Sequence, residues 1–183
     1  FRRVLFRSPT GLMLKSVLMA ALLALALETG KPAILHCRSG NGARDAQDAL
    51  LDELAAAGVG DARWAAAFVD RPAAVIHSYS GPLDYGRAVI DLGLAVSFSG
   101  LVFRAGEEAS AEVAPLVPDE AVLVETDSPF LAPPGAPRKR NEPEWVRVTA
   151  AWLADRRTTT VDALGGTLVA AYDRTFPRRG SHR

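Results

Sequence analysis

The chain contains one cysteine, three histidines and no excess of charge of either sign. A single cysteine cannot form an internal disulfide, which fits a reducing compartment, so we expect a cytoplasmic protein. The 21 basic and 21 acidic residues balance, so any binding of nucleic acid must come from local clusters. Because His182 lies in the C-terminal tail, the chain offers few nitrogen ligands for a metal.

Long apolar runs are also scarce, which argues against a membrane protein. Residues 12–27 are strongly apolar, but Lys15 interrupts them and the remaining run is short for a membrane span. We expect a buried helix here rather than a secretory signal, ended by Gly30 and Pro32. The length of 183 residues and the hydrophobic content of 49% predict one globular domain with a core.

The two ends of the chain are expected to differ from its middle. Residues 1–8 begin with Phe rather than Met and have no clear period. We predict that they are a non-native, adapter-derived segment and exclude them from fold reasoning. Residues 9–177 are expected to fold, and residues 178–183 are expected to form a disordered tail.

Short apolar runs alternate with helical patterns along the folded part. Strands are expected at 32–37, 74–79, 94–100 and 121–126, and helices at 12–27, 44–57, 82–93, 107–116, from about 143, and after Thr160. Strand–helix alternation implies crossover connections and a parallel sheet, and strands that are apolar on both faces are typical of a sheet covered by helices. An open doubly wound sheet and a closed barrel share this pattern.

Three of the expected strands end in residues that bind metals. His36 and His77 each follow three apolar residues, and Asp127 ends the run from Ala121. In a parallel barrel these ends meet on one rim, where imidazole and carboxylate form a divalent-metal site. Asp127 could also orient or deprotonate the attacking water. Alternatively, each histidine is an ordinary rim residue and Asp127 caps the turn at Ser128.

Other residues near these positions allow two interpretations each. Glu125 lies on the same sheet face as Asp127, either to support the metal site or as a buried, hydrogen-bonded acid. The cluster from Arg138 to Arg140 could hold phosphate oxygens or form a solvated loop. Cys37 is expected to be an inert strand thiol rather than a nucleophile. The acceptor that would orient each histidine is not evident from the residues.

Five segments together resemble the TatD family of metal-dependent deoxyribonucleases. They occur in the family's order, cover roughly residues 15–176, and include the specific pair Glu-Thr-Asp-Ser-Pro and Arg-Asn-Glu-Pro. The matching segments are Lys31–Arg38, Val75–Gly81, Val96–Gly100, Glu125–Pro133 and Arg140–Pro143.

The resemblance implies a (β/α)₈ TIM barrel of the metal-dependent hydrolase type, with two divalent ions and phosphodiester hydrolysis of the 3′–5′ DNA exonuclease kind. Zinc, manganese, magnesium and nickel are not distinguished. DNA or another phosphodiester would be the substrate, with neither a membrane nor an obligate protein partner expected. His36 and His77 would bind one metal and Asp127 the other, together with the water. The supporting or substrate-side residues would be Glu125, Arg38, Arg138, Arg140 and Asn141.

The chain departs from the family pattern at its start. It has no His-x-His motif, and a barrel of this type needs about 250 residues. We therefore expect an incomplete barrel, with residues 9–177 as its C-terminal portion, N-terminal β/α units missing, the eighth strand unplaced, and weak or no activity. Two alternatives stay open. One is another amidohydrolase-style metal hydrolase acting on an amide, a lactone or a tRNA ester. The other is a non-functional partial gene product.

Overall fold

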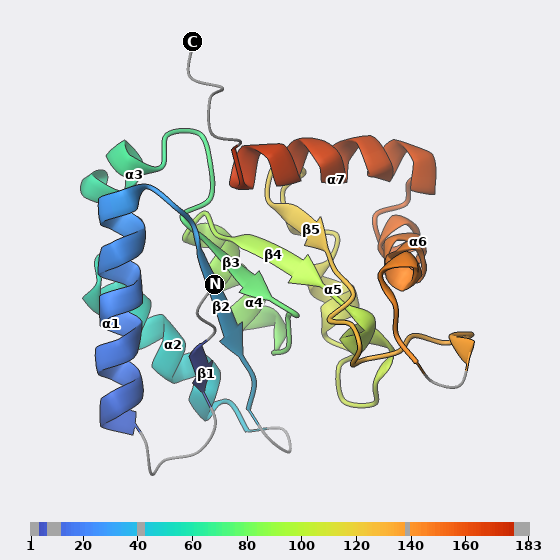
Figure 1. The fold of residues 1–183 in the computed structure, drawn as a ribbon, viewed down its shortest axis with the longest axis horizontal. Coiled ribbons are helices and arrows are strands. Elements are labelled where there is room, and N and C mark those ends of the chain that lie inside the picture. The colour runs from blue at the N-terminus through green and yellow to red at the C-terminus, as the bar shows by residue number, and fades with distance from the viewer. Residues whose placement is uncertain (1–3, 7–11, 40–42, 138–139, 178–183) are drawn as a thin grey trace.

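Five parallel strands form a single sheet in the computed structural model, which describes residues 4–6, 12–39, 43–137 and 140–177. The strands are β1 (Val4–Phe6), β2 (Ala33–Cys37), β3 (Ala74–His77), β4 (Ala95–Phe98) and β5 (Val122–Val124). The four strands expected from the apolar runs are all present (Figure 1). β1 belongs to the segment that we excluded from fold reasoning, and it pairs with β2. The non-native origin of residues 1–8 stays a prediction.

The order of the strands distinguishes between the two architectures that the sequence left open. Each strand pairs with its neighbours in the sequence, in the order β1-β2-β3-β4-β5, and all four pairings are parallel. In a doubly wound sheet the order reverses at a switch point, whereas in a barrel it advances in one direction. Over the described residues the sheet is an open arc edged by β1 and β5, which is the expected incomplete barrel.

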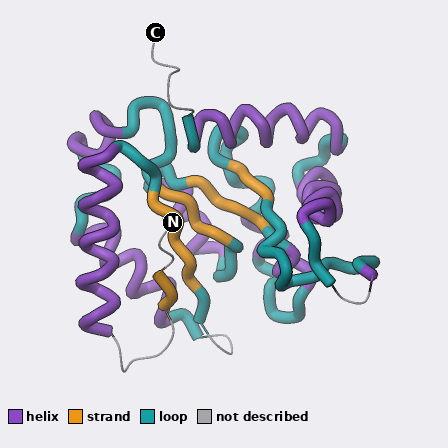
Figure 2. The backbone as a smooth tube through the Cα atoms, in the orientation of Figure 1, coloured by secondary structure: helices purple, strands orange, loops and turns teal. Residues whose placement is uncertain are grey.

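Helices separate the strands along the chain (Figure 2). They are α1 (Leu12–Thr29), α2 (Asp45–Ala56), α3 (Ala62–Ala67), α4 (Leu83–Asp91), α5 (Ser110–Val113), α6 (Val146–Arg156) and α7 (Val161–Thr175). Two 3₁₀ turns also occur, η2 (Gly100–Phe103) after β4 and η4 (Pro143–Trp145) before α6. Among the described residues, no helix is both long and apolar enough to cross a membrane.

Local signals explain where several helices begin and end. The Thr160 side chain accepts a hydrogen bond from the amide of Ala163 and caps α7, as expected. Gly30, with φ of 60°, ends α1 in the left-handed conformation. We did not expect α3, although Asp61 caps it by accepting from two amides. The helix expected over 107–116 is wrong in its bounds, because α5 covers only Ser110–Val113. It ends before Pro115, which has no amide hydrogen to donate.

The core lies between the sheet and the helices. Along β2, Ala33, Leu35 and Cys37 are buried, whereas Ile34 and His36 on the opposite face are partly exposed. Ala46, Leu50 and Leu54 of α2 are buried, so this helix packs one apolar face against the core. The partly exposed face of β2 is therefore the inner face of the arc, and it carries the first candidate ligand.

Candidate metal centre

The two candidate histidines are neighbours across the sheet. His36 of β2 pairs in register with His77 of β3. Their ring centroids lie 5.4 Å apart and the rings are tilted by 47°. Register partners in a parallel sheet point to the same face, so both imidazoles lie on the inner face of the arc, at the ends of their strands. The sequence expectation that they meet is confirmed.

Asp127 comes to the same place from beyond the end of β5. Its Oδ1 lies 3.6 Å from Nε2 of His77, and both side chains are mostly buried. Asp127 has φ of 56°, which is the left-handed region, one that aspartate tolerates better than most residues. His77 is therefore in contact with His36 on one side and lies 3.6 Å from Asp127 on the other.

Glu125 is the acceptor for His77 that the sequence did not identify. Its Oε2 lies 2.7 Å from Nδ1 of His77 and also accepts a hydrogen bond of 2.9 Å from the hydroxyl of Ser97. A carboxylate accepts hydrogen bonds, so this contact assigns the imidazole proton to Nδ1. In a neutral imidazole that donates from Nδ1, the lone pair is on Nε2, which lies 3.6 Å from Oδ1 of Asp127. This is how a carboxylate orients a metal-binding histidine.

The second oxygen of Glu125 gives a test of whether a cation fits here. Oε1 of Glu125 is buried and has no hydrogen-bond partner in the described part of the chain. A buried carboxylate oxygen without a partner is costly, and a nearby positive charge offsets the cost. Imidazole nitrogen with carboxylate oxygen is also a donor set that suits zinc, manganese, nickel and iron. In donor type and orientation, these residues fit a divalent cation.

The geometry stops short of a full set of ligands. Across residues 4–6, 12–39, 43–137 and 140–177, no group of three or more His, Cys, Asp and Glu side chains is arranged to hold one metal ion. His77 and Asp127 lie close together, and the ring of His36 lies beside that of His77. Of the three candidate ligands, His77 is the one whose orienting hydrogen bond, to Glu125, is described.

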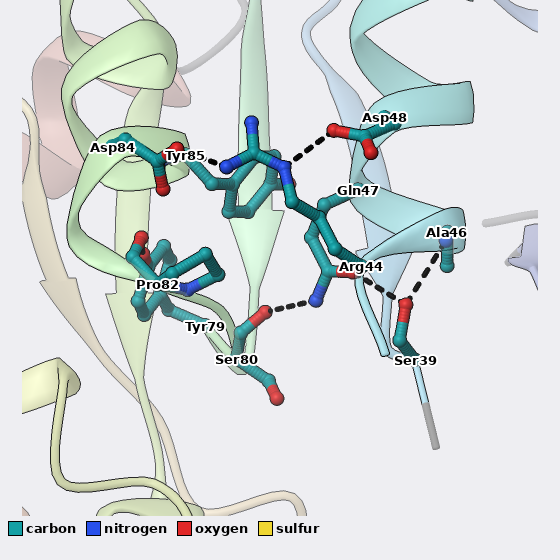
Figure 3. Close-up of polar contacts among 10 residues, drawn as sticks. All are labelled: Ser39, Arg44, Ala46, Gln47, Asp48, Tyr79, Ser80, Pro82, Asp84 and Tyr85. Atoms are coloured by element: carbon teal, nitrogen blue, oxygen red, sulfur yellow. Dashed lines mark hydrogen bonds and ion pairs between the residues drawn. The ribbon is translucent and has the colours of Figure 1, made fainter. Parts of the chain in front are cut away.

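A buried amide braces the strand ends that carry the histidines. Nε2 of Gln47, in α2, donates 2.9 Å to the carbonyl oxygen of Ser80, just after β3 (Figure 3). The hydroxyl of Ser39, just after β2, donates to Oε1 of Gln47 and accepts from the amide of Ala46 at 2.9 Å. We did not identify Gln47 from the sequence. The signal that could have indicated its role is its position next to Ala46 and three residues before Leu50, on the apolar side of the expected helix.

Of the basic candidates, the described residues Arg38 and Arg140 each pair with a different glutamate. Arg38 is half exposed, and its Nη2 lies 3.3 Å from Oε1 of the buried Glu107, which also accepts from Ser80. Burial raises the pKa of Glu107, although the hydrogen bond from Ser80 and the charge of Arg38 act in the opposite direction. Arg140 is exposed and pairs with Glu142 at 3.1 Å. Arg138 lies outside the described residues.

Asn141 does not have the role that its place before a helix suggests. Asparagine before a helix often caps it, but here Glu142 is the N-cap of η4. Instead Asn141 is buried, and its Nδ2 donates to the carbonyl oxygens of Thr126 and Phe130, on either side of Asp127. Its predicted place on the substrate side is not tested by this geometry.

Cys37 does not take part in the site. Its thiol is buried between the sheet and the helices, and burial raises its pKa to about 12. A thiol with this pKa stays protonated at neutral pH and is a poor nucleophile. The geometry agrees with the expectation of an inert thiol.

Comparison with known proteins gives consistent matches. The family model described as TatD related DNase matches residues 13–177. The chain is 35% identical over 150 residues to the 3′-5′ ssDNA/RNA exonuclease TatD of Pantoea ananatis, covering 79% of this chain and 51% of that protein. It is 32% identical over 149 residues to the uncharacterized metal-dependent hydrolase YcfH of Escherichia coli K12, covering 81% and 50%.

The fold matches as well. A crystal structure of the TatD homologue YJJV from Escherichia coli K12 superposes with a TM-score of 0.77 at 22% identity, covering 97% of this chain and 62% of that one. An uncharacterized amidohydrolase from Saccharomyces cerevisiae gives a TM-score of 0.71 at 17% identity, covering 90% and 60%. The chain spans about half the length of the curated relatives that it matches.

Proposed function

The chain belongs to the TatD related DNase family, and from this premise we propose that its function is the metal-dependent hydrolysis of phosphodiester bonds in nucleic acid. The single observation that supports this most is the position of His77, whose Nδ1 is bonded to Glu125 while its Nε2 lies 3.6 Å from Asp127. A histidine oriented by one carboxylate toward another is typical of a metal centre that activates water. The relative from Pantoea ananatis, named as a 3′-5′ ssDNA/RNA exonuclease, supports trimming from the 3′ end.

In this proposal, residues at the strand ends hold the cation and Glu125 orients the imidazole of His77. His77 binds through Nε2, because its Nδ1 proton is held by Glu125, and Ser97 holds Glu125 in turn. His36 is the second nitrogen ligand, as its ring is next to that of His77. The two-cation arrangement expected from the family resemblance stays a prediction.

Asp127 has the chemical role in the reaction. A bound divalent cation supplies the charge that lowers the pKa of water and offsets the negative charge of the phosphate. Asp127 accepts the proton of the attacking water, whose oxygen forms the new bond to phosphorus as the bond to the departing sugar oxygen breaks, and that oxygen takes up a proton from solvent.

The test is a nuclease assay on the chain with single-stranded DNA labelled at the 5′ end. Because the chain is expected to be weakly active, added manganese or magnesium should produce a slow ladder of shortened products at high protein concentration, and EDTA should stop it. Asp127→Asn should lower the rate by about 100-fold, the scale of a lost general base. Asp52→Asn, an exposed aspartate on α2, is the matched control and should trim at the original rate.

Two results would contradict the proposal. One is trimming by Asp127→Asn at the rate of the unchanged chain. The other is hydrolysis of an amide, lactone or aminoacyl ester without any hydrolysis of DNA, which would indicate a different hydrolase chemistry at the same residues. Both assays use one preparation and the same metal concentrations, so a loss of folded protein would lower both signals together.

A further inference from the structure

The loop that carries Asp127 has a backbone that needs external support. We define the Asp127 loop as residues 126–131. Asp127 and Leu131 have φ values of 56° and 58°, which non-glycine residues seldom adopt. Such residues persist where the surrounding structure holds them in place. The question is what holds this loop.

One side-chain amide bonds both sides of Asp127. Nδ2 of Asn141 donates 2.6 Å to the carbonyl oxygen of Thr126, the residue before Asp127, and also donates to the carbonyl oxygen of Phe130. Asn141 is distant in sequence from both acceptors and is 3% exposed. An amide nitrogen has two hydrogens, so both are used within the Asp127 loop.

The Asp127 loop also lies against Gly100, the first residue of η2, which follows β4. A Cβ atom added to Gly100 would lie 2.0 Å from the carbonyl oxygen of Leu131. The backbone of the loop therefore passes so close to Gly100 that no side chain fits between them. Asn141 therefore bonds the loop on both sides of Asp127, and Gly100 leaves room for the backbone of Leu131 to pass close by.

We propose that Asn141 is a positioning residue, whose amide holds the Asp127 loop so that the carboxylate of Asp127 faces Nε2 of His77. The proposal rests on the proposed function. A substrate contact by Asn141 is a poorer interpretation, because both of its N–H groups are used by the backbone and its oxygen is buried. The residue acts through Asp127 and touches neither metal nor nucleic acid.

The test compares Asn141→Ala with the unchanged chain in three measurements. Hydrogen exchange at the amide of Phe130, which is bonded to the carbonyl oxygen of Asp127 at 2.9 Å, should become faster by about 10-fold or more. The dissociation constant for Mn²⁺, measured by titration calorimetry, should rise by about 10-fold, as for other residues that support a ligand. In the nuclease assay kcat should fall by about 100-fold with KM unchanged, the scale of a small misplacement.

Two controls separate positioning from a general loss of stability. Val59→Ala, between α2 and α3, removes buried side-chain volume far from the loop and should leave Mn²⁺ affinity and exchange at Phe130 unchanged. Asn141→Ser keeps one hydroxyl donor and should fall between the unchanged chain and Asn141→Ala. It also replaces the alanine variant if that variant does not fold.

Three results would overturn the proposal. A higher KM with unchanged kcat would make Asn141 a substrate contact. A lower melting temperature with unchanged Mn²⁺ affinity, exchange and kcat would make it a structural residue only. Unchanged exchange at Phe130 would show that the amide does not hold the loop. If the unchanged chain neither binds Mn²⁺ nor trims DNA, the proposed function fails, and the exchange measurement still decides the role of Asn141.

Discussion

Gly100→Ala adds one methyl group at the point where β4 meets the Asp127 loop. Gly100 does not have a positive φ, so alanine meets no backbone strain there. Its effect comes from contact alone, because the new Cβ would lie 2.0 Å from the carbonyl oxygen of Leu131, and Cβ contacts below 3.0 Å essentially never occur. Backbone atoms on one side or the other must move by about 1 Å.

The size of the effect follows from this displacement. Forcing a methyl group into a packed site costs about 1–3 kcal/mol, which for a chain of this length lowers the melting temperature by roughly 2–12 °C. Leu131 is in the same loop as Asp127, so the shift also moves the carboxylate relative to His77. A misplacement of about 1 Å can cost about 100-fold in rate.

The assay is thermal unfolding of the variant with and without Mn²⁺, followed by the nuclease assay below the transition. Gly166→Ala is the matched control, because it makes the same substitution in α7 where nothing lies within 4 Å of the new Cβ. It should raise the melting temperature by roughly 2–4 °C, since alanine stabilises a helix interior by about 1 kcal/mol relative to glycine.

The reasoning would be refuted if Gly100→Ala melted at the original temperature and kept its response to Mn²⁺. That result would mean that the loop does not lie against β4, and the account of how Asp127 is held would lose one of its two supports. A lower melting temperature with an unchanged Mn²⁺ response would refute only the link between the loop and the metal centre.

Three further predictions concern single side chains. Glu125→Gln removes the charge that orients His77 and should weaken Mn²⁺ binding by about 10- to 100-fold in titration calorimetry, and unchanged affinity would exclude an orienting role. Burial raises the pKa of Glu107, so the folded state holds this proton more tightly than the unfolded state and loses stability as the pH rises from the usual carboxyl pKa through the raised one. Glu107→Gln should therefore melt higher than the original chain at pH 7.5 and close to it at pH 4, whereas an equal difference at both pH values would contradict this. With a pKa of about 12, Cys37 should not react with a thiol reagent at pH 8 until denaturant is added, and rapid labelling of the native chain would show an accessible thiol.

The elements of the fold were largely predictable because their signals are local. Short apolar runs specified β2 to β5, and the expected cap at Thr160 matches α7. Short-range patterns fail where the signal is weak, as for α3, or where a proline ends a helix early, as for α5. The sequence also predicted that His36, His77 and Asp127 lie at or just after strand ends, because each follows an apolar run. In parallel strands these ends share one edge of the sheet.

What only the tertiary structure decided was which groups meet. The alternation of apolar strands and helices along the sequence is the same in a doubly wound sheet and in a barrel. The order of the strands in the sheet distinguished the two folds. Glu125 is 48 residues from His77, and Asn141 is 15 residues from Thr126. Hydrogen bonds act over about 3 Å, so such partners depend on strand register and loop path, which local sequence does not contain. The residue types that could bind a metal are therefore a property of the sequence, and their orientation is a property of the fold.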